Sequence, residues 1–203
     1  MLNILLPLLL LNSAHAAGIA ATAQDVRPIA IGQKIPSVKI NTLEGKEVDL
    51  AAEMKGTHTI LVFYRGGWCP YCNLQLAALG GLKDQLNDLG WKMMAISPDR
   101  PELLAETKNK HKLDYRLYSD SGCNAARALG LAFTIDDSRL KKLKSYGIDL
   151  LWASGQKQAE LPVPAVYLVG ADGAVLFQYA NPDYKIRLDG DVLLAAATAY
   201  GPK

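Results

Sequence analysis

The strongest constraint on the fold is a run of apolar and β-branched residues from Thr59 to Tyr64. The run does not alternate between apolar and polar residues, so both faces of the strand that it predicts must be buried, as in the centre of a covered sheet. A helical pattern begins soon afterwards at Pro70 and ends at Gly90, with apolar positions at Leu79, Leu82, Leu86 and Leu89. The pair Gly80 and Gly81 predicts a kink, since each glycine costs a helix about 1 kcal/mol relative to alanine.

The remaining pattern predicts further strands and helices on both sides of this unit. Two short segments on either side of Thr42 to Gly45 alternate apolar and polar residues, which predicts an N-terminal β-hairpin. After the first helix we expect strands at 91–96, 115–118, 165–169 and 174–179, and helices at 101–110, 124–129 and 191–200. Asp120 and Asp191 are the expected helix caps. This order is typical of an α/β fold with a mixed sheet and helices on both faces.

The domain boundaries follow from composition. Ile4 to Leu11 is an apolar run too short to span a bilayer, which takes roughly 20 residues, and Ala14 and Ala16 are the small residues that a signal peptidase requires. We predict a signal peptide (1–16, cleaved after Ala16), a leader (17–33) and one domain (34–203) with a partly helical insert (134–160). The expected location is the periplasm, without stable membrane insertion; an uncleaved N-terminal anchor is the alternative.

Charge and cysteine content exclude several classes of function. The net charge is +2 and the basic residues are scattered, so the sequence gives no reason to expect nucleic acid as a partner. Half of the residues are apolar and 21% are charged, which is enough apolar material for a core without disulfide bonds. Three cysteines are too few for a disulfide scaffold. Because no paired metal-ligand spacing accompanies them, we expect neither a metal nor a cofactor.

The chemistry is predicted at Cys69 and Cys72, a Cys-x-x-Cys motif at the start of the helix. The free backbone N–H groups and the positive end of the helix dipole stabilise a thiolate there. Two intervening residues allow the second sulfur to reach the first, so a sulfenic acid or a mixed disulfide can be resolved within one turn. Cys123 also begins a predicted helix; it is expected to be a buried thiol, with a role in resolving or bridging as the alternative.

The segment from Phe63 to Cys72 resembles the Cys-x-x-Cys branch of the peroxiredoxin-like AhpC/TSA family, within the thioredoxin-fold superfamily. Supporting similarities lie at Ile96 to Asp99, Ser119 to Gly122 and Gly170 to Gly173. The resemblance implies a thioredoxin-like fold and places the peroxide-reactive role on Cys72. The sequence departs from the family where Cys69 replaces a threonine and where Pro164 replaces an arginine.

These departures bear on the expected substrate site. A proline in the position of Pro164 resembles the cis-proline of thioredoxin-like proteins, with an ordinary trans bond as the alternative. Arg65 is expected either to provide a cation for the thiolates or to be a solvated loop residue. Trp68, Pro70 and Tyr71 are expected to form an apolar rim around the sulfurs and, with Arg65 and Pro164, to bind substrate.

Two reactions are compatible with this dithiol. In the first, favoured by the family resemblance, Cys72 attacks hydrogen peroxide or an organic hydroperoxide, and Cys69 then closes the redox-active disulfide. In the second, Cys69 attacks a protein disulfide and Cys72 resolves the mixed disulfide. Both need an external, thioredoxin-like dithiol reductant. A secreted, non-catalytic binding domain is a minor alternative, because so small a disulfide ring is a poor structural bridge.

Overall fold

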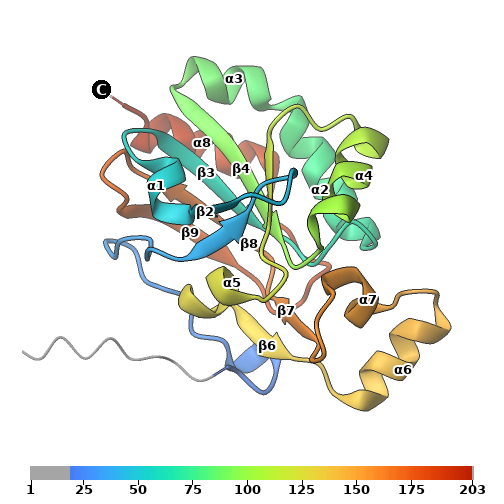
Figure 1. The fold of residues 1–203 in the computed structure, drawn as a ribbon. Helices are drawn as coiled ribbons and strands as arrows, with labels where there is room; N and C mark the ends of the chain where they lie inside the picture. Colours follow the sequence, from blue (N-terminus) through green and yellow to red (C-terminus); the bar gives the residue numbers. More distant parts are fainter. Residues whose placement is uncertain (1–18, 203) are drawn as a thin grey trace, which may run out of the picture.

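The computed structural model describes residues 19–202 (Figure 1). The predicted signal peptide and its cleavage site therefore lie outside the described residues, and the leader is described from Ile19 onward. Within 19–202, none of the helices is long and apolar enough to cross a membrane.

A seven-stranded mixed sheet organises the domain, in the order β2-β1-β5-β4-β3-β8-β9. The predicted apolar run forms β3 (His58–Phe63), which lies parallel to β4 (Trp91–Ser97) and antiparallel to β8 (Ala165–Val169). Next to β4 lies β5 (Arg116–Ser119), and β9 (Val175–Ala180) forms a hairpin with β8. At the other edge, β1 (Lys39–Asn41) and β2 (Glu47–Asp49) pair antiparallel. This is the expected mixed α/β sheet.

Helices cover both faces of the sheet. The side chains of β3 point alternately to either side and so contribute to two cores. Ile60, Val62 and Tyr64 belong to a core with α2 (Pro70–Gly81), α3 (Lys83–Asp88), α4 (Pro101–His111) and α8 (Gly190–Tyr200). Leu61 and Phe63 belong to a second core with α1 (Leu50–Met54) and α5 (Asn124–Ala128). The full burial of these β3 side chains agrees with the continuous apolar run.

The helix predicted from Pro70 to Gly90 is interrupted, as the glycine pair indicated. It ends at Gly81 and a second helix begins at Lys83, with Leu82 between them. Leu79 and Leu86 are nevertheless buried in the same core, so the apolar spacing is satisfied across the break. One cap differs from the prediction: the carboxylate of Asp189, rather than that of Asp191, caps α8 by accepting the N–H of Asp191.

The insert is more ordered than its sequence indicated. It contains α6 (Asp137–Ser145) and α7 (Leu150–Ser154), between two short antiparallel strands, β6 (Ala132–Thr134) and β7 (Glu160–Pro162). These strands have a small core of their own, which includes Phe133 and Leu161. In Figure 1, α6 and α7 lie together at one edge of the molecule, next to the start of α2. The insert thus borders the dithiol.

Candidate active site

The dithiol lies in the connection between the central strand and α2. Cys69 is the residue before the helix, Pro70 is its first residue and Cys72 lies in its first turn. Proline suits this position because its missing N–H would have no helical partner there. Gly67 connects the loop to its surroundings: its N–H donates to Asp99 Oδ2 at 2.7 Å, and its carbonyl accepts from Asn73 Nδ2 at 2.8 Å. A Cβ at this position would lie 2.0 Å from Thr107 Oγ1, so a larger residue would displace the loop or α4.

The two sulfurs differ in their access to solvent. Both residues are buried, with 1% of Cys69 and 0% of Cys72 accessible. Cys69 lines a groove of about 490 Å³, whereas Cys72 does not line it, although both residues belong to the same core. All three cysteines are unpaired, so the structure describes the dithiol form. A molecule that enters the groove therefore meets Cys69 before Cys72.

The two thiols also differ in pKa, and the more accessible one has the lower value. A hydrogen bond from the Cys72 thiol lowers the pKa of Cys69 to about 6, with smaller contributions from the Cys72 backbone N–H, Arg65 and Arg187. Burial raises the pKa of Cys72 well above its ordinary value, and the neighbouring Cys69 sulfur raises it further. At neutral pH the pair therefore carries its negative charge on Cys69.

Arg187 is a functional candidate that the sequence analysis missed. Its Nη2 donates to Cys72 Sγ at 3.2 Å and its Nη1 donates to Gln75 Oε1 at 2.8 Å. Its Nε donates to the carbonyl of Tyr184 at 2.7 Å, which fixes the guanidinium plane. The segment between β9 and α8 has no motif, so no sequence signal predicts that it reaches the dithiol. The guanidinium places a positive charge beside the Cys72 sulfur.

Arg65 is not a solvated loop residue, since only 4% of it is accessible. Its guanidinium carbon lies 5.0 Å from the centre of the Trp68 ring and 4.1 Å from that of Tyr184, in cation–π contacts. Burial lowers the pKa of Arg65, while the sulfurs of Cys69 and Cys72 raise it. Of the two expectations for Arg65, the structure agrees with a cation beside the thiols.

Asp99 is a second group whose role the sequence did not reveal, although it ends the Ile96 to Asp99 segment that supported the family resemblance. Its Oδ2 accepts the N–H of Gly67, and the Ser97 hydroxyl at 3.3 Å. Its Oδ1 has no hydrogen-bond partner within 19–202. Burial raises the pKa of Asp99 to about 6, and the Cys69 sulfur also raises it. A titratable carboxyl therefore holds the loop that carries the dithiol.

The predicted rim residues and Pro164 have different placements. Trp68, Pro70 and Tyr71 line the groove together with Arg65 and Cys69, as expected. Pro164 is buried and does not line the groove, although its neighbour Ala165 pairs with Phe63 at the same end of the sheet. The cis bond expected at Pro164 is wrong, because no peptide bond within 19–202 is cis. Its carbonyl accepts the N–H of Asn181 at 3.3 Å.

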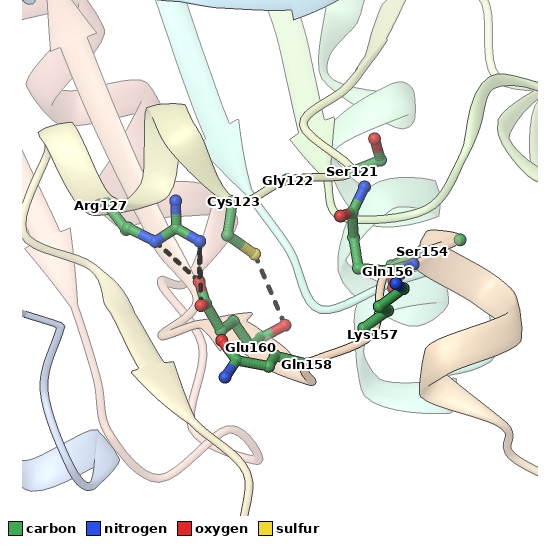
Figure 2. A pocket seen from close by; sticks show the side chains of 10 residues that line it. Ser121, Gly122, Cys123, Arg127, Ser154, Gln156, Lys157, Gln158 and Glu160 are labelled. Atoms are coloured by element: carbon green, nitrogen blue, oxygen red, sulfur yellow. Dashed lines mark hydrogen bonds and ion pairs between the residues drawn. The ribbon is translucent and has the colours of Figure 1, made fainter.

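Cys123 lies in a different pocket, shown in Figure 2, which shares no lining residue with the Cys69 groove. Its thiol donates a weak hydrogen bond to the carbonyl of Glu160 at 3.5 Å, beside the bidentate pair between Arg127 and Glu160. Burial raises the pKa of Cys123 well above its ordinary value, and Asp120 and Glu160 raise it further. Its sulfur belongs to the core on the opposite face of the sheet from Cys69. The geometry agrees with a buried thiol.

Comparison with known proteins identifies the family. The sequence profile of the AhpC/TSA family matches residues 31–178, which is well over half of the chain. The chain belongs to the AhpC/TSA family. The match includes Cys69, Cys72 and Asp99, whereas Arg187 lies beyond it. Among the described residues no group of three or more His, Cys, Asp or Glu side chains is arranged to hold a metal ion.

Relatives within this family include two kinds of thiol enzyme. Peroxiredoxin Bcp of Escherichia coli is 26% identical over 106 residues, which cover 52% of this chain and 67% of that protein. The thiol-disulfide oxidoreductase ResA of Bacillus thuringiensis is 23% identical over 167 residues, covering 82% of this chain and 79% of that protein. The comparisons support a thiol-dependent peroxidase or thiol-disulfide oxidoreductase.

Solved structures of a peroxidoxin and of Prx3 share the fold. The peroxidoxin BcpB of Mycobacterium tuberculosis superposes with a TM-score of 0.65 at 16% identity, over 86% of this chain and 99% of that one. Reduced Prx3 of Vibrio vulnificus gives a TM-score of 0.69 at 16% identity, over 83% and 98%. The expected thioredoxin-like fold is confirmed.

Proposed function

We propose that this AhpC/TSA protein is a thiol-disulfide oxidoreductase in which Cys69 attacks the substrate and Cys72 resolves. The observation that carries the proposal is the position of Cys69: it lines the groove and has the lower pKa, about 6. This reverses the roles that the family resemblance implied, because Cys72 does not line the groove.

The reaction proceeds in two exchanges. The Cys69 thiolate attacks one sulfur of a substrate disulfide, the substrate S–S bond breaks and one substrate thiolate leaves. Cys72 then attacks the Cys69 sulfur of the mixed disulfide, its proton passes to the departing thiolate, and the second substrate thiol is released. The substrate gains two electrons, and the Cys69–Cys72 disulfide must be reduced by an external dithiol. Arg187, at 3.2 Å from the Cys72 sulfur, favours the thiolate needed for the second step.

Peroxide reduction is the second candidate, supported by the same Arg187 contact and by family membership. In that reaction the Cys72 thiolate attacks the O–O bond, forming a sulfenic acid and releasing hydroxide or an alkoxide, which takes up a proton. Cys69 then displaces the sulfenic oxygen as water and closes the same disulfide. Arg187 supplies the positive charge that the replaced family arginine would otherwise provide.

Two single variants distinguish the reactions. Reduced Cys69→Ser and Cys72→Ser proteins are each mixed with 2-hydroxyethyl disulfide or with hydrogen peroxide and analysed by intact mass. For disulfide exchange we expect Cys72→Ser to accumulate a mixed disulfide on Cys69, and Cys69→Ser to trap none. A fast peroxide reaction that is lost only in Cys72→Ser would establish the peroxidase instead. If neither oxidant reacts faster than with a free thiol, both proposals are overturned.

Export and the reductant belong to the same proposal. The apolar run from Ile4 to Leu11 and the small residues at Ala14 and Ala16 support cleavage after Ala16 and a periplasmic mature protein. The cycle consumes two electrons per turnover, which supports a thioredoxin-like dithiol as the reducing partner. N-terminal sequencing of the mature protein tests the export proposal, with Ala17 as the expected first residue.

A further inference from the structure

The insert forms one wall of the groove, and the proposed function assigns no role to this wall. From α6 come Arg139, Lys142 and Leu143, and Tyr146 and Ile148 follow from the next segment. Opposite them lie Cys69 and Arg65. The groove is therefore formed jointly by the dithiol loop and by a segment that is not part of the central sheet. Substrate selection is a role that such a wall can perform.

The charges of this groove are unbalanced. It is lined by three cations, Arg65, Arg139 and Lys142, and by one carboxylate, Asp136. The Asp136 carboxylate is engaged at the start of α6, where it accepts the N–H of Arg139 at 2.8 Å. None of the ion pairs found within 19–202 includes any of the three cations.

Arg65 and Arg139 also repel one another. The charge of Arg139 lowers the pKa of Arg65, in the same direction as burial, and the Cys69 sulfur is the largest influence that opposes it. When Cys69 attacks a disulfide, its negative charge passes to the leaving group. Two guanidinium groups and an ammonium group would then line the groove with the Asp136 carboxylate as the one anion among its lining side chains. An anion on the substrate itself would remove this imbalance.

We infer that the groove selects organic disulfides that carry a carboxylate beside the reacting sulfur, with Arg139 and Lys142 binding the carboxylate. Leu143, Tyr146 and Tyr184 provide apolar surface for the rest of the molecule. The inference rests on the proposed disulfide exchange and adds the substrate class to it. In this arrangement Arg139 and Lys142 are binding residues, and Cys69 retains the chemistry.

Binding can be measured separately from the reaction. Thiodiglycolate carries two carboxylates but has a thioether instead of a disulfide, so it occupies the site without reacting. We expect it to quench the tryptophan fluorescence of the reduced protein saturably, through Trp68 in the groove, with affinity about tenfold weaker in Arg139→Gln/Lys142→Gln. Lys141→Gln is the matched control, because Lys141 lies on the same helix but does not line the groove. Absence of binding to the unsubstituted protein at millimolar concentration would overturn the inference.

Reaction rates supply the second measurement. Stopped-flow oxidation is compared for dithiodiglycolate, 2-hydroxyethyl disulfide and cystamine, which carry charges of about −2, 0 and +2 at neutral pH. Each rate is divided by that of the same disulfide with dithiothreitol, which removes differences in leaving group. We expect the anion to be preferred over the cation by about tenfold or more, with a preference that falls with salt and in Arg139→Gln/Lys142→Gln.

The two proposals fail in different ways. Equal normalised rates for the three disulfides, with a fast reaction throughout, would overturn the charge selection but leave disulfide exchange intact. Rates no faster than those of dithiothreitol for all three would overturn the exchange itself, and the thiodiglycolate measurement would still decide whether the groove binds the anion.

Discussion

The Nη2 group of Arg187 donates a hydrogen bond to the Cys72 sulfur at 3.2 Å, between residues 115 positions apart in the chain. The contact joins the segment before α8 to the first turn of α2. It places a positive charge beside the more deeply buried of the two sulfurs. Burial disfavours the thiolate form of Cys72, and the positive charge opposes this effect. The ionisation of Cys72 therefore depends on a residue that lies outside the part of the chain matched by the family profile.

Replacement of Arg187 by Gln should slow disulfide closure. Loss of the cation raises the pKa of Cys72 further, so fewer molecules hold the thiolate that attacks the mixed disulfide. We expect closure to be about tenfold slower, measured by stopped-flow fluorescence after mixing with excess 2-hydroxyethyl disulfide. Arg187→Lys should recover part of the rate, and Lys185→Gln, an exposed cation of the same segment, should have no effect. An unchanged rate in Arg187→Gln would exclude this role.

Alkylation of Cys69 should follow its lowered pKa. The rate of Cys69 alkylation by iodoacetamide is expected to rise with pH through a midpoint near 6. Peptide mass spectrometry measures the modification of each cysteine separately. Cys72→Ala should move this midpoint upward, because it removes the thiol that donates to the Cys69 sulfur. Cys123 serves as the internal control and should stay unmodified in the folded protein, since it is buried. A midpoint near 9 in the unsubstituted protein would contradict the assignment of Cys69 as the attacking thiolate.

Asp99 should make the protein less stable as the pH rises. Its pKa is about 6 in the folded state against about 4 in the unfolded chain, so the folded state binds the proton more tightly. Its contribution is present below pH 4 and is lost as the pH rises to about 6. Burial raises the pKa of Asp120 in the same direction, to about 7, so Asp99 must be isolated by comparison with Asp99→Asn.

The measurement is urea unfolding of both proteins at pH 4 and pH 7. We expect the free energy of unfolding of the unsubstituted protein, relative to Asp99→Asn, to fall by about 2 kcal/mol over this interval. A difference that is independent of pH would show that the carboxyl titrates alike in the folded and unfolded states.

Gly67→Ala should disturb the dithiol loop. Its Cβ would lie 2.0 Å from Thr107 Oγ1, so the loop or α4 must shift and the bond from the Gly67 N–H to Asp99 would be weakened. We expect at least a tenfold loss of the disulfide-exchange rate, by the assay with 2-hydroxyethyl disulfide.

Gly81→Ala is the matched control for this substitution. A Cβ at Gly81 meets no atom within 4 Å, and its φ lies outside the left-handed region. Alanine there should leave the rate unchanged and stabilise the protein by about 0.5–1 kcal/mol. A Gly67→Ala protein as active as Gly81→Ala would show that the loop tolerates the displacement.

Elements whose formation depends on neighbouring residues can be predicted from the sequence. The apolar run of β3, the helix start at Pro70, the break after Gly81 and the hairpin of β8 and β9 all follow from local periodicity and from the conformational preferences of glycine and proline. The position of Cys69 and Cys72 at a helix start has the same origin. The strands β6 and β7 were missed because each has three residues and, unlike β1 and β2, no short turn joins them: α6 and α7 lie between them in the chain.

The burial of each sulfur and the groups that surround the dithiol depend on the tertiary structure. Burial raises the pKa of Cys72, and a hydrogen bond from the Cys72 thiol lowers the pKa of Cys69, so the two values separate although both residues lie in one short motif. Arg187, Asp99 and the α6 wall approach the dithiol from distant parts of the chain, with no local pattern to indicate it. Charges and hydrogen bonds act through space, so their effect on a thiol is set once the chain is folded.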